Sequence, residues 1–291
     1  MSIKFRRIVF LLILFGFSVF LSGCEDKKVD IKVPVEGCGR IISTAPSITE
    51  TLFALGLGSN ITGVTGNCHF PDGVEKKAKI GEVLDINMES VLMLKPDTVF
   101  VLSANQSLKN KLGSLKIKTV VIDQSTIDGF MASLDIIGKE CLVEEKATEL
   151  KKSISERMTP SKTAELKKVM IVAGRDYFSE NIKDVYIAGN DRFYSELLKF
   201  AGAGNVYHGD LSYPKIQLEG IISMNPDIIV DVVTIGNECE KQKEMFLKSW
   251  SSLCDVNAVK NNRVFIVCKD YWSIPGPRFV NIIEELSEMV K

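Results

Sequence analysis

Residues 87–97 read Asn-Met-Glu-Ser-Val-Leu-Met-Leu-Lys-Pro-Asp, and residues 217–227 repeat the pattern as Gln-Leu-Glu-Gly-Ile-Ile-Ser-Met-Asn-Pro-Asp. Both segments carry a glutamate at their third position and end in Pro-Asp. Two further pairs of segments keep the same order along the chain: 49–58 with 195–204, and 119–122 with 264–267. Three matches in one order indicate an internal duplication, so we expect two similar lobes.

Short β-rich runs alternate with amphipathic helical stretches from Arg40 onward. This alternation is typical of an α/β fold with mainly parallel central sheets. Arg40 to Ser43 predicts a strand, and Ser47-Ile48-Thr49-Glu50 after it predicts a capping box that opens a helix ending at Gly56. A helix that begins at the carboxyl end of a strand lies where open α/β sheets bind ligands.

The first residues predict export and lipid attachment. Three basic residues precede an apolar run at 8–20, and the run is closed by Leu21-Ser22-Gly23-Cys24. This pattern is typical of a lipoprotein signal peptide, and the run is short for a membrane span. We expect residues 1–23 to be removed, Cys24 to carry the lipid (palmitate among its acyl chains), and 24–39 to form a flexible tether. A short transmembrane anchor with an incidental cysteine is the alternative.

Charge and cysteine content restrict the function. The net charge is −1, and no stripe of basic residues is interleaved with aromatic residues, so nucleic acid is not an expected partner. A lipid-anchored domain would be extracytoplasmic, at the outer face of the cytoplasmic membrane or in a periplasm, where disulfides are permitted. The spacing leaves the pairing open among Cys38, Cys68, Cys141, Cys239, Cys254 and Cys268.

A segment rich in Glu, Lys and Ala lies between the repeated halves. Residues 143–158 have apolar positions at helical spacing before Thr159-Pro160 interrupts them. We therefore divide the chain into an N-terminal lobe at 40–142, a linking helix region at 143–166 and a C-terminal lobe at 167–291. An ordinary surface helix is the alternative for the middle segment.

Motifs along the whole mature chain resemble those of the substrate-binding lipoproteins of ABC importers. They are Arg40-Ile41-Ile42-Ser43, Pro46, Thr49-Glu50, Gly63-Val64, Phe70-Pro71, Asn87-Met88-Glu89, Lys95-Pro96-Asp97 and Pro275-Gly276-Pro277-Arg278. The likeness is greatest to the helical-backbone class that carries cobalamin, haem and ferric siderophores, and within it to vitamin B12-binding members. It implies two lobes joined by a single long rigid helix, with the ligand in the cleft between them.

The resemblance also implies partners. In this family a glutamate on each lobe pairs with arginines of a two-fold permease dimer, whose separate ATPase subunits hydrolyse ATP. The matching positions here are Glu89 and Glu219. Equivalent carboxylates on duplicated lobes suit equivalent basic pockets on a symmetric dimer. Both acids also lie in expected first helical turns, where they oppose the helix dipole, so a structural role is the alternative.

The same resemblance places the ligand between loops of both lobes. A large flat or corrinoid ligand needs apolar area with a few polar anchors. The residues implied to contact it are Pro46, Ser47, Asn67, Cys68, His69, Phe70, Tyr186, Tyr213, Tyr271 and Trp272. Vitamin B12-binding members carry an aromatic residue where this chain has Asn67, and again near Leu84, so the chain departs from them at two positions.

Two groups of residues in this region have alternative interpretations. His69 is either an axial ligand of haem iron or corrinoid cobalt, or a partner within a proline-containing turn. Cys68 is either a soft ligand, or buried or in a disulfide with Cys38. Arg175, Arg192 and Arg278 are candidate anchors for carboxylate or hydroxamate groups, and ordinary salt bridges are the alternative for each.

Other functions have weaker support. A site for bare zinc or manganese is not expected with His69 and His208 as the only histidines. No nucleophile elbow, zinc-protease motif, P-loop or dinucleotide fingerprint occurs, so the chain is not expected to be an enzyme or to hold a cofactor. A surface adhesin or sensor without a permease is a further alternative. The first candidate ligand is therefore a corrinoid-type metal chelate. A ferric siderophore or haem is the second candidate, and molybdate or tungstate is the last.

Overall fold

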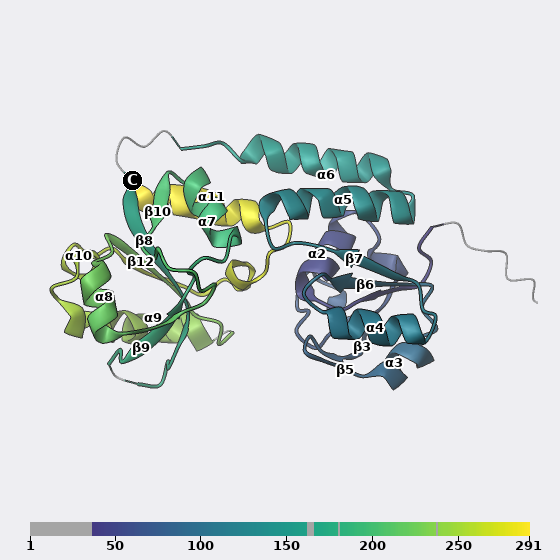
Figure 1. The fold of residues 1–291 in the computed structure, drawn as a ribbon, viewed down its shortest axis with the longest axis horizontal. Coiled ribbons are helices and arrows are strands. Elements are labelled where there is room, and N and C mark those ends of the chain that lie inside the picture. The colour runs from purple at the N-terminus through teal and green to yellow at the C-terminus, as the bar shows by residue number, and fades with distance from the viewer. Residues whose placement is uncertain (1–36, 162–165, 180, 237) are drawn as a thin grey trace, which may run out of the picture. The chain divides into compact units, whose positions relative to one another are not determined.

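The computed structural model describes residues 37–161, 166–179, 181–236 and 238–291, which contain two β-sheets flanked by helices (Figure 1). The expected signal peptide, Cys24 and most of the expected tether lie outside the described residues. No described helix is both long enough and apolar enough to cross a membrane. We call the first sheet and its helices the N-terminal lobe, and the second sheet and its helices the C-terminal lobe.

The first sheet is entirely parallel. Its strand order is β3 (Ala78–Lys79), β2 (Ile61–Val64), β1 (Ile41–Ser43), β6 (Thr98–Leu102) and β7 (Thr119–Ile122). The central strand β1 is buried along its whole length, as expected for a strand covered on both faces. A separate hairpin is formed by β4 (Gly81–Glu82) and β5 (Asp85–Ile86).

The second sheet is parallel through its centre and antiparallel at one side. Its order is β11 (Lys215–Gln217), β9 (Asp184–Ile187), β8 (Lys167–Arg175), β12 (Ile228–Val232) and β13 (Val264–Val267), with β10 (Ala203–Asn205) paired to β8. Strand β9 is antiparallel to both β8 and β11. The expectation of an α/β fold with mainly parallel sheets is confirmed.

The repeated segments occupy equivalent places in the two sheets. Helix α3 (Met88–Met93) leads into β6, and α8 (Leu218–Met224) leads into β12. In the first copy Asp97 Oδ2 accepts hydrogen bonds from the backbone N–H groups of Gly39 and Arg40, just before β1. In the second copy Asp227 Oδ2 accepts from the N–H of Lys168 in β8. Each Pro-Asp motif therefore ties the start of one central strand to its neighbour.

The helix at the end of β1 begins differently from the prediction. Helix α2 (Pro46–Ala54) has Ala45 as its N-cap with no side-chain hydrogen bond, and Pro46 occupies its first turn. Proline favours the first helical position because its φ is already helical and it has no N–H to satisfy. The capping box expected from Ser47 to Glu50 is therefore wrong. The predicted end is correct, since Gly56 takes a φ of 75° beyond the last turn.

Paired helices lie between the sheet-forming segments. Helix α5 (Ile127–Cys141) turns at Leu142 and Val143 into α6 (Glu144–Arg157), and the two lie side by side (Figure 1). A Cβ at Gly138 would come within 2.9 Å of the Ala147 Cβ, so the glycine permits this close approach. The predicted linking region at 143–166 contains the helix α6, which ends at Arg157 and packs against α5.

Apolar packing continues from one lobe into the other. Helix α11 (Phe279–Val290) places Phe279 5.4 Å from the Phe130 ring of α5 and 6.0 Å from the Phe193 ring of α7 (Phe193–Phe200), measured between ring centroids. One buried apolar cluster includes side chains of both lobes. The remaining helices are α4 (Gln106–Ser114), α9 (Glu238–Lys248), α10 (Asn257–Lys260), η1 (Gly58–Asn60), η2 (Val74–Lys76), η3 (Ser251–Leu253) and η4 (Asp270–Ser273).

Two disulfides join cysteines of the described residues, one in each lobe. Cys38 pairs with Cys141 across 103 residues in the N-terminal lobe, and Cys239 pairs with Cys268 across 29 residues in the C-terminal lobe. Cys68 and Cys254 are free. The alternative that pairs Cys68 with Cys38 is therefore wrong.

Candidate ligand-binding cleft

Two adjoining cavities lie at the carboxyl ends of parallel strands from both sheets. The first has a volume of about 540 Å³ and the second about 660 Å³, and both are lined by Ser273, Ile274 and Pro275. Volumes of this size are typical of sites for small molecules, and strand carboxyl ends are where open α/β sheets bind them. Together they form one cleft with walls from both lobes.

The wall of the second cavity is built largely from segments that follow four parallel strands. They are Ala45 to Ser47 at the start of α2 after β1, Asn67 and His69 after β2, Val233, Thr234 and Gly236 after β12, and Cys268 with Asp270 after β13. The Asn67 side chain accepts a hydrogen bond from the backbone N–H of Val83 in the β4–β5 hairpin, at 3.3 Å. The hairpin is thereby held beside this cavity.

The first cavity has walls from both lobes. The N-terminal lobe contributes Ala104 after β6, and Gln124 and Ser125 after β7; the C-terminal lobe contributes Ala173, the segment 190–194, Ser212, Tyr213 and Trp272. Trp272 is completely buried, and its indole N–H donates to Glu285 Oε2 at 2.9 Å. This cavity combines aromatic and aliphatic surface with a few polar groups, as ligand sites do.

The expected ligand contacts divide into two groups by position. Pro46, Ser47, Asn67 and His69 line the second cavity, and Tyr213 and Trp272 line the first. Cys68, Phe70, Tyr186 and Tyr271 line neither of the two cavities. Tyr186 lies on β9 opposite Lys215 of β11, and the Tyr271 hydroxyl donates to Glu285. Ligand contact by any of the ten stays a prediction.

Cys68 and His69 point to different environments although they are neighbours. The Cys68 sulfur is buried, 3.2 Å from the hydroxyl oxygens of Thr49 and Thr65. His69 is exposed and lines the second cavity. Within the described part of the chain, no group of three or more His, Cys, Asp or Glu side chains is arranged to hold a metal ion.

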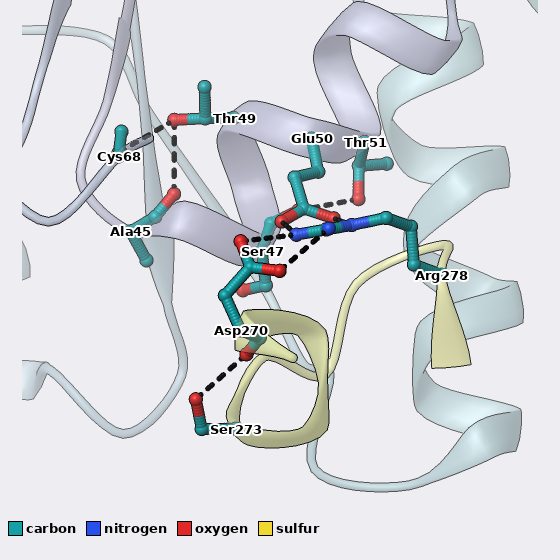
Figure 2. A network of polar contacts seen from close by, with 9 residues as sticks. All are labelled: Ala45, Ser47, Thr49, Glu50, Thr51, Cys68, Asp270, Ser273 and Arg278. Carbon is teal, nitrogen blue, oxygen red and sulfur yellow. Dashed lines mark hydrogen bonds and ion pairs between the residues drawn. The ribbon is translucent and has the colours of Figure 1, made fainter. Parts of the chain in front are cut away.

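Arg278 connects the two lobes through ion pairs with Glu50 and Asp270 (Figure 2). Its guanidinium donates to both carboxylate oxygens of Glu50 in α2, at 2.8 and 2.5 Å, and to both of Asp270, at 2.9 and 3.0 Å. The Phe70 ring stacks against it, with 3.9 Å between the guanidinium carbon and the ring centroid. Burial raises the pKa of Glu50, and the pairing with Arg278 opposes that rise. Arg278 therefore forms ion pairs within the protein and is not free to bind a ligand carboxylate or hydroxamate.

The other two candidate arginines have different surroundings. The Arg175 side chain is 1% exposed and its Nε donates to Asp231 Oδ2 at 2.8 Å, so it forms an internal ion pair. Its guanidinium also lies over the rings of Tyr177 and Phe246. Arg192 is exposed and lines the first cavity at the start of α7. Of the three, Arg192 is the one placed to meet a ligand.

The polar residues of the first cavity that the sequence did not single out include Gln124 and Asp191. Gln124 is 2% exposed, and Asp191 accepts hydrogen bonds at Oδ2 from the Tyr213 hydroxyl at 3.2 Å and the Tyr194 N–H at 3.4 Å. Burial raises the pKa of Asp191 to about 6. The rule that ligands meet strand carboxyl ends could have found Gln124, which follows β7 closely.

The raised pKa of Asp191 predicts how its stability contribution varies with pH. Between the usual Asp pKa and about 6 the folded chain holds a proton that the unfolded chain releases, so stability falls as pH rises through this range. Asp191→Asn removes the charge that is costly in the folded chain above a pH of about 6, so the variant should melt at a higher temperature than the wild type at a pH of about 7.5. We expect a difference of about 2–4 °C and no more, because Asp191 is only partly buried. Thermal unfolding at a pH of about 4.5 should show no such gain. A variant that is equally destabilised at both pH values would contradict this.

The two surface glutamates singled out from the repeat occupy equivalent positions. Glu89 lies in the first turn of α3 and Glu219 in the first turn of α8, and both are exposed. Neither forms an ion pair with another described residue. Their carboxylates are therefore available at the molecular surface on matching elements of the two lobes.

Comparisons with known proteins agree with this geometry. A family model described as "Periplasmic binding protein" matches residues 41–271. The uncharacterized ABC transporter substrate-binding lipoprotein YvrC of Bacillus subtilis is 30% identical over 286 residues, which cover 94% of this chain and 86% of the relative. A vitamin B12-binding protein of Vibrio parahaemolyticus is 23% identical over 258 residues, which cover 88% of this chain and 89% of the relative.

A solved structure shares the fold. It is a possible iron-binding, periplasmic solute-binding protein from Staphylococcus epidermidis, with a TM-score of 0.70 and 29% identity over 87% of this chain and 98% of that one. The similarity to each of these proteins extends over most of both chains.

Proposed function

Because the chain belongs to the periplasmic binding protein family and is an ABC importer's substrate-binding protein rather than an enzyme, we propose that it captures a corrinoid of the cobalamin type and delivers it to the permease. The observation that carries the proposal is the cleft, whose two adjoining cavities of about 540 and 660 Å³ have walls from both lobes. A bulky ligand with flat apolar surface suits a cleft of this size and lining. The relative from Vibrio parahaemolyticus is a vitamin B12-binding protein.

The proposal includes a location and partners. A lipid on Cys24 would hold the chain at the membrane, where Glu89 and Glu219 would meet two equivalent basic pockets on a permease dimer. Import would use ATP hydrolysed by separate subunits, and this chain would need no cofactor of its own.

A ferric siderophore or haem is the second candidate ligand. Arg192 supports it, because an exposed guanidinium on the wall of the first cavity can pair with a carboxylate or hydroxamate. His69 on the second cavity could reach a haem iron or a corrinoid cobalt as an axial ligand. Molybdate or tungstate has less support, because a small oxyanion would leave most of the cleft unfilled.

Equilibrium dialysis of the full chain in detergent tests the ligand class directly, since the candidate ligands absorb visible light. The probes are cyanocobalamin, cobinamide, haemin and a ferric hydroxamate. We expect binding of the corrinoids to be weakened about tenfold by Tyr213→Ala, since this side chain lines the first cavity. Phe178→Ala is the matched aromatic control, because Phe178 is exposed outside both cavities. Binding of none of the probes would overturn the proposed function.

A further inference from the structure

Two buried oxygen atoms at the first cavity have no hydrogen-bond partner among the described residues. They are Gln124 Oε1, from the N-terminal lobe, and Asp191 Oδ1, from the C-terminal lobe. A buried acceptor without a partner costs about 1–3 kcal/mol of stability, so such groups are rare in native proteins. Both residues line the first cavity, so a ligand bound there with N–H groups would supply the missing donors.

The neighbours of Gln124 determine which end of its amide is unpaired. The Nε2 group lies 3.2 Å from Thr51 Oγ1 and 3.5 Å from Ser133 Oγ. Both hydroxyl groups already donate elsewhere, Thr51 to the Ser47 carbonyl at 2.7 Å and Ser133 to the Phe130 carbonyl at 2.6 Å. They can therefore only accept from Gln124, so its NH₂ group must face them. The atom left unpaired is the oxygen, an acceptor.

The Asp191 carboxylate presents a second acceptor. Its Oδ2 is occupied by the Tyr213 hydroxyl and the Tyr194 N–H, and its Oδ1 is buried without a partner. An ionised carboxylate can only accept hydrogen bonds. The nearby tyrosines hold the carboxylate in place but leave this oxygen to a ligand.

The rest of the lining favours one kind of ligand group. Much of it is apolar, including Ala104, Ala173 and Trp272, and the basic side chain on this wall, Arg192, is exposed. A ligand carboxylate near Gln124 and Asp191 would place acceptor against acceptor, which is unfavourable in a dry site. A neutral carboxamide would offer N–H donors to both.

We infer that Gln124 and Asp191 accept hydrogen bonds from carboxamide N–H groups on the periphery of the ligand, and so select an amide-bearing macrocycle over an acid-bearing one. The inference rests on the proposed function and deepens it. It assigns specificity to two residues that line the same cavity from different lobes, so a ligand must be in contact with both lobes to satisfy them.

The test compares two corrinoids that share one ring, cobinamide with side-chain amides and cobyrinic acid with carboxylates at those positions. Equilibrium dialysis of the full chain should show cobinamide binding at least about tenfold more tightly. Asp191→Asn keeps the shape but exchanges the free acceptor for a donor. It should weaken cobinamide about tenfold and leave cobyrinic acid unchanged or bound more tightly. Gln124→Met, which removes the amide at similar length, should weaken cobinamide about fivefold.

Controls separate this inference from the proposed function. Asp255→Asn makes the same chemical change at an exposed position outside both cavities and should leave both affinities unchanged. Thermal unfolding of each variant identifies any loss of fold. Equal wild-type affinity for the two corrinoids, or an unchanged ratio in Asp191→Asn, overturns the inference while the proposed function stands. Binding of haemin or ferric hydroxamate but of neither corrinoid overturns the inference together with the corrinoid proposal, in favour of the second candidate ligand. Binding of no probe overturns every ligand proposed.

Discussion

Exchanging Glu89 and Glu219 together for glutamine should leave ligand affinity unchanged and reduce uptake of the ligand about 100-fold in cells that contain the permease. Both carboxylates are exposed in first helical turns on duplicated elements, outside the cleft. Interface ion pairs that become buried cost about 2–5 kcal/mol when one partner is removed. The measurements are dialysis with the purified chain and accumulation of labelled cobalamin in cells.

The single variants and a control pair sharpen this prediction. If the two lobes meet equivalent pockets of a symmetric dimer, Glu89→Gln and Glu219→Gln should each give an intermediate loss. Glu145→Gln with Glu149→Gln removes two exposed carboxylates from α6 and should have little effect on uptake. Normal uptake by the Glu89 and Glu219 double variant would show that these carboxylates do not mediate docking.

Replacing Arg175 by methionine should lower the free energy of unfolding by about 3–5 kcal/mol, because the change leaves the buried Asp231 carboxylate without its cation. Asp231 is 0% exposed, and its Oδ2 accepts from Arg175 at 2.8 Å and from the Trp250 indole N–H at 2.9 Å. Urea unfolding of the two proteins measures the difference. Arg157→Met is the matched control, since its pair with Glu284 is partly exposed and should contribute less than about 1 kcal/mol.

The pH dependence of the Arg175→Met variant provides a second check. Burial already raises the pKa of Asp231, and loss of Arg175 should raise that pKa further. At low pH the buried acid is neutral and needs no cation, so the deficit should shrink as pH falls and be largest at neutral pH. A deficit that is independent of pH would assign the loss to packing against Tyr177 and Phe246 instead.

The repeated segments in the sequence predicted the two-sheet architecture well, because each copy keeps the residues that make the same local contacts. Asp97 and Asp227 accept hydrogen bonds from backbone N–H groups at the starts of equivalent strands. Gly56 and Gly202 adopt φ values of 75° and 76° after equivalent helices. The local sequence pattern also predicted one feature wrongly, the start of helix α2. Ser47 and Glu50 have capping-box spacing, but Pro46 starts the helix and Glu50 pairs with Arg278 instead.

The candidate site was less predictable, since it depends on contacts between residues far apart in the chain. Pro46 begins the helix that follows β1, and Asn67, His69 and Tyr213 lie on loops next to strands, so their positions can be identified from strand patterns. The free acceptor on Gln124 depends on how Thr51 and Ser133 use their hydroxyl groups, 73 and 9 residues away. Likewise, no spacing rule connects Cys38 with Cys141 or Glu50 with Arg278.

The two disulfides affect how stable the folded chain is before and after export. Thiols are kept reduced inside the cell, so a newly made chain lacks the bonds of Cys38 with Cys141 and Cys239 with Cys268. Each bond contributes about 2–4 kcal/mol by restricting the unfolded chain. Both lobes are therefore less stable before export, which helps to keep the chain unfolded until then. Formation of the two disulfides after export stabilises the folded form.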